Sequence, residues 1–269
     1  MNNLHRELAP VSAAAWDDLE DEARRTFVEN LAGRRVVDVV GPSGPTFAAV
    51  GTGHVRELDT PDSPVRTRLR QVAAVVELRV PFTVTRAAVD SVERGAKDAD
   101  WQPVKDAART LAYAEDRLVV DGLAAAGVVG LRTAAAESGR AAIELPAAAT
   151  DYPATVAEAL RELRLAGVAG GYALLLSADA YTAMDETTED GYPVREHVAR
   201  VLGEDGKIVW APGIEGAVLL STRGGDYELH LGQDTSVGYL SHDADTVSLY
   251  LEESLTFLVN TAEAAVALG

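Results

Sequence analysis

The chain of 269 residues contains no cysteine. The missing thiols exclude disulfide bonds, cysteine nucleophiles and zinc sites with thiolate ligands. Long hydrophobic runs are missing too, because no stretch approaches the ~20 apolar residues of a membrane-spanning helix. The first ten residues, MNNLHRELAP, lack the apolar centre of a signal peptide. We therefore expect a cytoplasmic protein with no membrane partner.

Positive charge is scarce as well. The chain has 24 Lys and Arg against 42 Asp and Glu, for a net charge of −18. A surface of this sign repels phosphate groups, so nucleic acid is not an expected partner. It also opposes unspecific aggregation, so any self-association has to be specific. The apolar fraction of 47% predicts a folded chain with a real core.

Catalytic motifs are missing from the sequence. It has no P-loop, GxSxG or HExxH motif, and its five histidines show no metal-ligand spacing. Gly51-Thr52-Gly53 lacks the third glycine of a dinucleotide loop, so we interpret it as a flexible strand or a bulge. Adjacent Glu252 and Glu253 point to opposite faces of a strand and cannot form a catalytic pair. We interpret them as sheet-edge or interface charges, one of which pairs with an arginine. These patterns predict neither an enzyme nor a metal site.

The remaining sequence predicts a mixture of helices and strands. Residues 12–33 form a helix with Ser12 as its N-cap, and a strand covers 34–40. A second long helix begins near residues 100–103 and ends near Gly122. Residues 133–222 indicate a separate α/β unit with helices at 153–166, 178–185 and 194–202 and strands at 172–177, 207–210 and 217–222. The last segment is all strand, and one strand from Thr246 to Asn260 exceeds the usual length of ~5–6 residues.

Residues 46–78 form a predicted hairpin around the turn TPDSP. Arg66, Arg68 and Arg70 alternate with smaller or apolar residues, which places the arginines on one face. A lone hairpin is marginally stable in water, so it has to lie on another surface. We expect it to lie across a neighbouring copy of the chain.

Several ordered segments resemble encapsulins, the bacterial nanocompartment shell proteins. They are LAPVSAAAW (8–16), EARRTF (22–27), GRRVVDVVGPSG (33–44), SVERGAKD (91–98), AYAEDRLVVDG (112–122) and residues 224–257. The resemblance implies an α+β fold of the Hong Kong 97 phage-capsid type. It also implies a peripheral domain (1–45, 79–132 and 223–269), an extended loop (46–78) and an axial domain (133–222). About sixty copies of such a subunit close an icosahedral shell in the smallest family members.

The same resemblance implies that catalysis belongs to a cargo protein with a C-terminal targeting peptide. The expected cargo is a dye-decolorizing peroxidase, and the alternative is a ferritin-like protein. Any haem or iron would then belong to the cargo. The family's cargo groove corresponds to these residues of the present chain: Phe27, Arg34, Val36, Asp38, Leu231 and Val237. Asp38 is expected to pair with a basic residue of the peptide.

The densest acidic loop corresponds to the family's five-fold pore loop. It comprises Asp185, Glu186, Thr187, Thr188, Glu189, Asp190, Gly191 and Tyr192. Four acids in each copy would form a ring that admits cations and repels anions. Without symmetry, the same loop is simply a solvated turn.

One departure from the family concerns flavin. Some relatives place a tryptophan after the strand that ends at Val84, whereas this chain has Arg86-Ala87-Ala88. We therefore expect no flavin and no other cofactor. Two other functions stay open at this point: a phage major capsid protein, and a hydrolytic or antibacterial protein.

Overall fold

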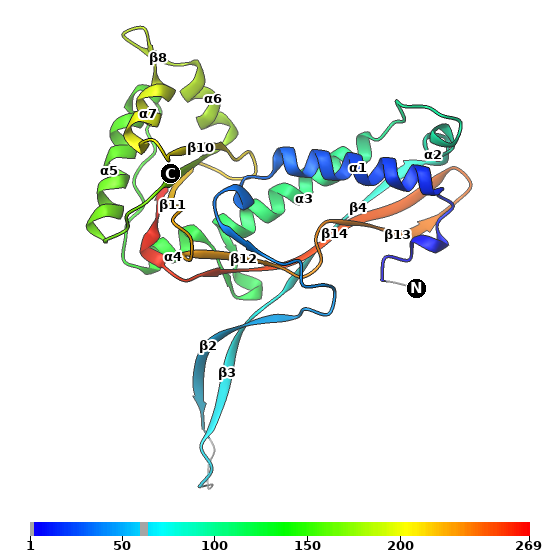
Figure 1. Cartoon of the computed structure of the whole chain (residues 1–269), viewed down its shortest axis with the longest axis horizontal. Helices are drawn as coiled ribbons and strands as arrows, with labels where there is room; N and C mark the ends of the chain where they lie inside the picture. Colours follow the sequence, from blue (N-terminus) through cyan, green and yellow to red (C-terminus); the bar gives the residue numbers. More distant parts are fainter. Residues whose placement is uncertain (1–2, 60–63) are drawn as a thin grey trace.

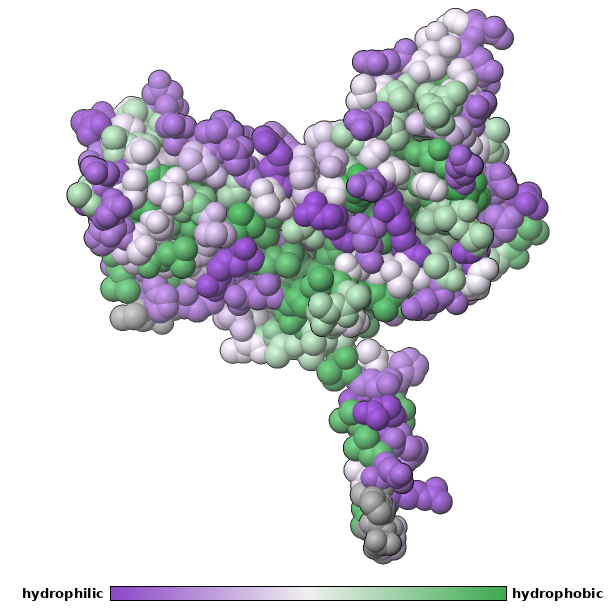
Figure 2. Space-filling view, turned by 180° about the vertical axis from the view of Figure 1, so that it is seen from behind, coloured by the Kyte–Doolittle hydropathy of each residue, from purple (hydrophilic) through white to green (hydrophobic). Residues whose placement is uncertain are grey.

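The computed structural model describes residues 3–59 and 64–269. It shows two lobes side by side and a two-stranded hairpin that projects away from both (Figures 1 and 2). Most of the predicted turn TPDSP lies outside the described residues. Within the described residues, no helix combines the length and the hydropathy that a membrane span requires.

The first lobe is built on a five-stranded sheet around one long strand, β14. Its strands are β1 (Asp38–Val40), β4 (Val76–Thr85), β12 (Tyr227–Leu231), β13 (Ser236–His242) and β14 (Thr246–Val259). β14 pairs antiparallel with β4 along one edge and with both β13 and β12 along the other. This confirms the predicted long strand. Because β14 has neighbours on both sides, it is an interior strand of the sheet.

Three helices cover one face of this sheet: α1 (Ala13–Asn30), α2 (Arg86–Glu93) and α3 (Gln102–Val120). The predicted cap is confirmed, because the Ser12 hydroxyl accepts a hydrogen bond from the Ala15 backbone N–H at 3.2 Å. The apolar stripe of α1 is buried against α3 and the sheet. α2 was not predicted, although Thr85 caps it in the same manner.

The predicted end of the first helix is wrong by three residues. α1 stops at Asn30, and Leu31 is already extended. The Asp116 carboxylate of α3 accepts the next backbone donors, from Ala32 at 3.0 Å and Gly33 at 2.7 Å. The turn Gly33–Arg35 follows, so only Asp38–Val40 of the predicted strand 34–40 is extended in a sheet.

The projecting hairpin consists of β2 (Ala49–Leu58) and β3 (Thr67–Ala74). Most of its side chains are exposed. The register shifts between Gly51 and Val55, and Gly53 has a φ of +79°, which confirms the predicted bulge. The predicted continuous run 65–80 is divided at Val75, after which β4 enters the sheet of the first lobe.

The second lobe contains a four-stranded sheet in the order β10 (Lys207–Trp210), β7 (Tyr172–Leu176), β11 (Ala217–Ser221) and β15 (Ala265–Leu268). Its helices are α4 (Leu131–Glu137), α5 (Tyr152–Leu165), α6 (Ala178–Glu186) and α7 (Val194–Leu202). Two short hairpins complete the chain, β5 (Gly122–Leu123) with β6 (Val128–Val129) and β8 (Thr188–Glu189) with β9 (Tyr192–Pro193).

The C-terminal strand differs from the predicted division of the chain. Residues 223–269 were grouped with the first lobe, yet β15 pairs antiparallel with β11 of the second lobe. The reason is burial, because Ala265, Val266 and Leu268 are at most 1% exposed in the core around that sheet.

Candidate functional site

A cavity of about 400 Å³ lies between α1 and the strands β13 and β14. We call it the α1 pocket. Its apolar lining residues are Ala23, Phe27, Val28, Val237 and Leu251, and its charged lining residues are Glu20, Arg24, Arg34 and Asp234. Three of the six predicted groove residues, Phe27, Arg34 and Val237, therefore meet here.

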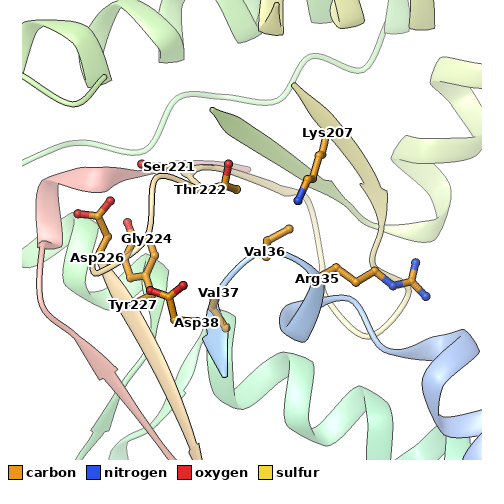
Figure 3. A pocket seen from close by; sticks show the side chains of 10 residues that line it. All are labelled: Arg35, Val36, Val37, Asp38, Lys207, Ser221, Thr222, Gly224, Asp226 and Tyr227. Atoms are coloured by element: carbon orange, nitrogen blue, oxygen red, sulfur yellow. The ribbon is translucent and has the colours of Figure 1, made fainter. Parts of the chain in front are cut away.

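The other three predicted groove residues lie elsewhere. Val36 and Asp38 line a second cavity of about 160 Å³, where Lys207 points toward the first lobe from β10 of the second lobe (Figure 3). The Asp38 carboxylate already accepts the Gly225 backbone N–H at 2.6 Å. Leu231 is 2% exposed and belongs to the core. The six residues thus do not form a single cavity.

Arg34 is held by three carboxylates at the edge of the α1 pocket. Its Nη2 donates to Glu115 Oε2 at 2.6 Å and to Glu253 Oε2 at 3.1 Å, and its Nη1 donates to Asp234 Oδ1 at 2.9 Å. The guanidinium carbon also lies 5.2 Å from the centre of the Phe27 ring. The predicted pairing of one of the two adjacent glutamates with an arginine is confirmed, whereas Glu115 and Asp234 were missed.

Burial governs the electrostatics of this network, since Glu115 and Glu253 are both 0% exposed. Burial raises the pKa of Glu253 well above its ordinary value, and the charge of Glu115 adds to this shift. Burial opposes the charge of Arg34, but the hydrogen bonds and charges of the carboxylates outweigh it and raise the pKa of the guanidinium. The network therefore favours the charged form of Arg34 and shifts Glu253 toward its protonated form.

The neighbouring Glu252 confirms that the two glutamates serve different sites. Its Oε2 accepts from Arg79 Nε of β4 at 2.7 Å, and the Arg79 guanidinium lies 4.2 Å from the centre of the Tyr250 ring. Both glutamates are buried, so their interpretation as sheet-edge or interface charges was wrong. The physical reason is that β14 is an interior strand with both faces covered.

Asp116 gives the fold a pH dependence that a single substitution tests. Burial raises its pKa to about 7, against the opposing effect of the Gly33 and Ala32 backbone hydrogen bonds. The folded chain then holds a proton that the unfolded chain releases near pH ~4. Stability therefore falls as the pH rises from about 4 to about 7, by at most about 1.4 kcal/mol per pH unit.

In Asp116→Asn this slope should disappear, because the amide oxygen still accepts both backbone N–H groups and has no proton to lose. We expect the variant to gain stability relative to the parent chain as the pH rises through that window. Thermal unfolding of both proteins over this range measures the difference. Parallel curves for the two proteins would contradict the assignment.

The acidic loop forms the tip of the second lobe (Figure 1). Asp190 and Gly191 both have positive φ, of 50° and 80°, as a two-residue hairpin turn requires. Asp185 is paired with Arg195 at 2.7 Å, and Glu189 lies 3.7 Å from His197. The loop therefore presents less free negative charge than its four acids suggest. Among the residues that the structure describes, no group of three or more acidic or histidine side chains is arranged to hold a metal ion.

The three hairpin arginines lie where the alternation predicts. Arg66, Arg68 and Arg70 are all exposed. Arg68 is opposite Glu57 and Arg70 is opposite Val55, so these four side chains share one face. Their positions leave the arginines accessible to another subunit.

Comparison with known proteins shows which family the chain resembles. A family model described as "Encapsulating protein for peroxidase" matches residues 1–256. The chain is 59% identical to a type 1 encapsulin shell protein of Rhodococcus erythropolis, with 100% of both chains covered. It is 54% identical to that of Mycobacterium tuberculosis, again with 100% of both chains covered.

Solved structures with low sequence identity share the fold. A virus-like particle from Pyrococcus furiosus matches with a TM-score of 0.65 at 16% identity, over 94% of this chain and 99% of that one. A Mycobacterium phage Bobi chain matches with a TM-score of 0.56 at 13% identity, over 90% and 89%. These likenesses confirm the expected α+β phage-capsid fold of the Hong Kong 97 type.

Proposed function

Because the chain belongs to the family of encapsulating proteins and is a shell protein of the type 1 encapsulin kind, we propose that its shell encloses a cargo enzyme. The cargo is held through a C-terminal targeting peptide that binds in the α1 pocket. The observation that supports this most is the apolar floor of that pocket beside charged side chains, the chemistry that a short amphipathic peptide requires. About sixty copies form an icosahedral shell in the cytoplasm.

The proposed cargo is a dye-decolorizing peroxidase, with a ferritin-like protein as the alternative. The description of the matching family names peroxidase, which supports the first. Since the family is one of shell proteins, neither a phage capsid role nor a hydrolytic activity gains support. The shell itself is proposed to carry no flavin, because α2 begins with Arg86, Ala87 and Ala88, which offer no ring for stacking. Flavin absorption in purified, cargo-free shells would contradict this.

Cargo loading tests the proposed site. Val28 lines the α1 pocket and is 57% exposed, so Val28→Asp should leave the fold intact. We expect the variant to reduce the cargo that co-purifies with shells about tenfold, because a buried carboxylate would oppose the peptide's aliphatic residues. Leu165→Asp is the matched control, since Leu165 is 71% exposed on the second lobe. Equal loading of Val28→Asp and parent shells would remove the α1 pocket from cargo binding.

Asp38→Ala extends the same experiment to the second cavity. A reduced load would mean that the peptide reaches from the α1 pocket as far as Asp38. An unchanged load would limit the peptide site to the α1 pocket and remove Asp38 from it.

We also propose that the acidic loop lines an opening at the five-fold axis. Glu186, Glu189 and Asp190 are exposed there, whereas Asp185 is paired with Arg195. Replacing the three exposed acids by their amides should remove a preference for cations over anions of matched size. Entry rates of small charged dyes into purified shells measure this preference. Equal cation and anion entry in parent shells would refute the proposal.

A further inference from the structure

Arg24 on α1 is a charged residue of the α1 pocket without an acidic partner. Among the described residues, no carboxylate lies within ion-pair distance of it. The other charged lining residues all have partners: Glu20 pairs with Arg6, and Arg34 pairs with Asp234 and the two buried glutamates. In the described structure, Arg24 is thus the charged lining residue of the pocket that makes no ion pair, in a chain of net charge −18.

The sequence alone suggests a different partner for Arg24. Glu20 lies four residues before it on α1, which is the favourable spacing for an ion pair on a helix. Glu20 instead bonds to Arg6, whose Nε also donates to the Val237 carbonyl oxygen at 2.7 Å. Arg6 further lies over the Trp16 ring at 5.1 Å. These contacts fix Arg6 between α1 and β13, so Glu20 is occupied. Asp21, three residues before Arg24, makes no ion pair with it in the described structure, so Arg24 stays available.

We propose that Arg24 is a specificity-determining residue that binds an acidic side chain of the peptide in the α1 pocket. This inference rests on the proposed function of that pocket. Phe27 and Val28 lie three and four residues after Arg24, on the same side of α1. An aliphatic peptide residue that packs on these side chains brings a neighbouring Asp or Glu within reach of the guanidinium. The recognised segment therefore combines aliphatic residues with an acid.

Competition between peptide tails tests the proposal in whole shells. The probe is a monomeric fluorescent protein that carries a short randomised C-terminal tail and is co-expressed with the shell chain. Mass spectrometry of the tails recovered from purified shells, compared with the input, gives the preference at each position. For parent shells we expect enrichment of aliphatic residues together with Asp or Glu, the acid by about two- to fivefold for a partly exposed pair.

Variants of Arg24 separate its role from that of the pocket. Arg24→Ala should lose the enrichment of acids and keep that of aliphatic residues, and Arg24→Glu should enrich Lys and Arg instead. Arg25→Ala is the matched control, because Arg25 carries the same charge, pairs with Glu22 and does not line the pocket. Unchanged enrichment of acids in both Arg24 variants would overturn the proposal, while surviving aliphatic enrichment would leave the proposed function intact.

Two further outcomes are decisive. If parent shells enrich no tail residue and Val28→Asp shells load the same tails as parent shells, both the proposed function and this inference would be wrong. Extending the tails by a neutral Gly-Ser segment moves the terminal carboxylate away from the pocket. If the enrichment of acids disappears when the tails are extended, Arg24 binds the terminal carboxylate of the peptide. That result would overturn the proposal that it binds an acidic side chain.

Discussion

Arg34→Ala is expected to destabilise the chain by about 3–5 kcal/mol, the usual cost of leaving buried charge without its partner. The substitution leaves Glu115 and Glu253, both 0% exposed, without the guanidinium that satisfies them. For a chain of this size, the loss corresponds to a fall of about 10 °C in the unfolding temperature. Thermal unfolding of the purified variant measures it.

Arg35→Ala is the matched control for this experiment. Arg35 is the next residue, and among the described residues its guanidinium donates only to the carbonyl oxygens of Val28 and Glu29. We expect a cost below about 1 kcal/mol there. Replacing Arg34 by Met together with Glu115→Gln and Glu253→Gln should restore much of the stability, since no unpaired charge is then buried. Equal melting of the Arg34→Ala and Arg35→Ala proteins would contradict the assigned role of the network.

Deleting residues 55–68 should block the formation of closed shells while the two lobes stay folded. The strands that remain face each other, since Val50 pairs with Ala73 and Gly51 with Val72, so an Asn-Gly turn can replace the deleted segment between His54 and Leu69. The deleted segment contributes no buried side chain to either core among the described residues. We expect the product to sediment as small species with an unfolding transition close to that of the parent lobes.

A charge variant separates the arginines from the rest of the hairpin. Replacing Arg66, Arg68 and Arg70 by Glu keeps the length of the strands and reverses the charge of one face. We expect this triple variant to assemble less readily than the parent chain. Its assembly should also depend more strongly on salt concentration, because salt screens exposed charges. Closed particles of parental size from the deletion variant would refute the role of the hairpin.

Local signals predicted much of the fold. The Ser12 cap, the apolar stripe of α1 and the long strand β14 were all confirmed, because each depends on residues close together in the sequence. The end of α1 was missed because Asp116, more than eighty residues away, takes the Ala32 and Gly33 backbone donors. The position of β15 was missed for a similar reason, since its pairing with β11 is a long-range contact.

The candidate site was predicted less completely than the fold. The resemblance selected Phe27, Arg34 and Val237, which line one pocket, but also Val36 and Asp38, which line another. The carboxylates around Arg34 come from α3, β14 and the loop before β13, so no spacing in the sequence brings them together. Glu115 and Asp116, which lie between the buried apolar residues Leu111 and Leu118 of α3, were the available signal for a buried polar network.

The mass of the purified chain in solution tests the central claim most directly. The account predicts a single species of about sixty times the 28.4 kDa subunit, seen by negative-stain electron microscopy as uniform hollow particles. Monodisperse monomers or dimers under conditions in which the chain is folded would contradict it.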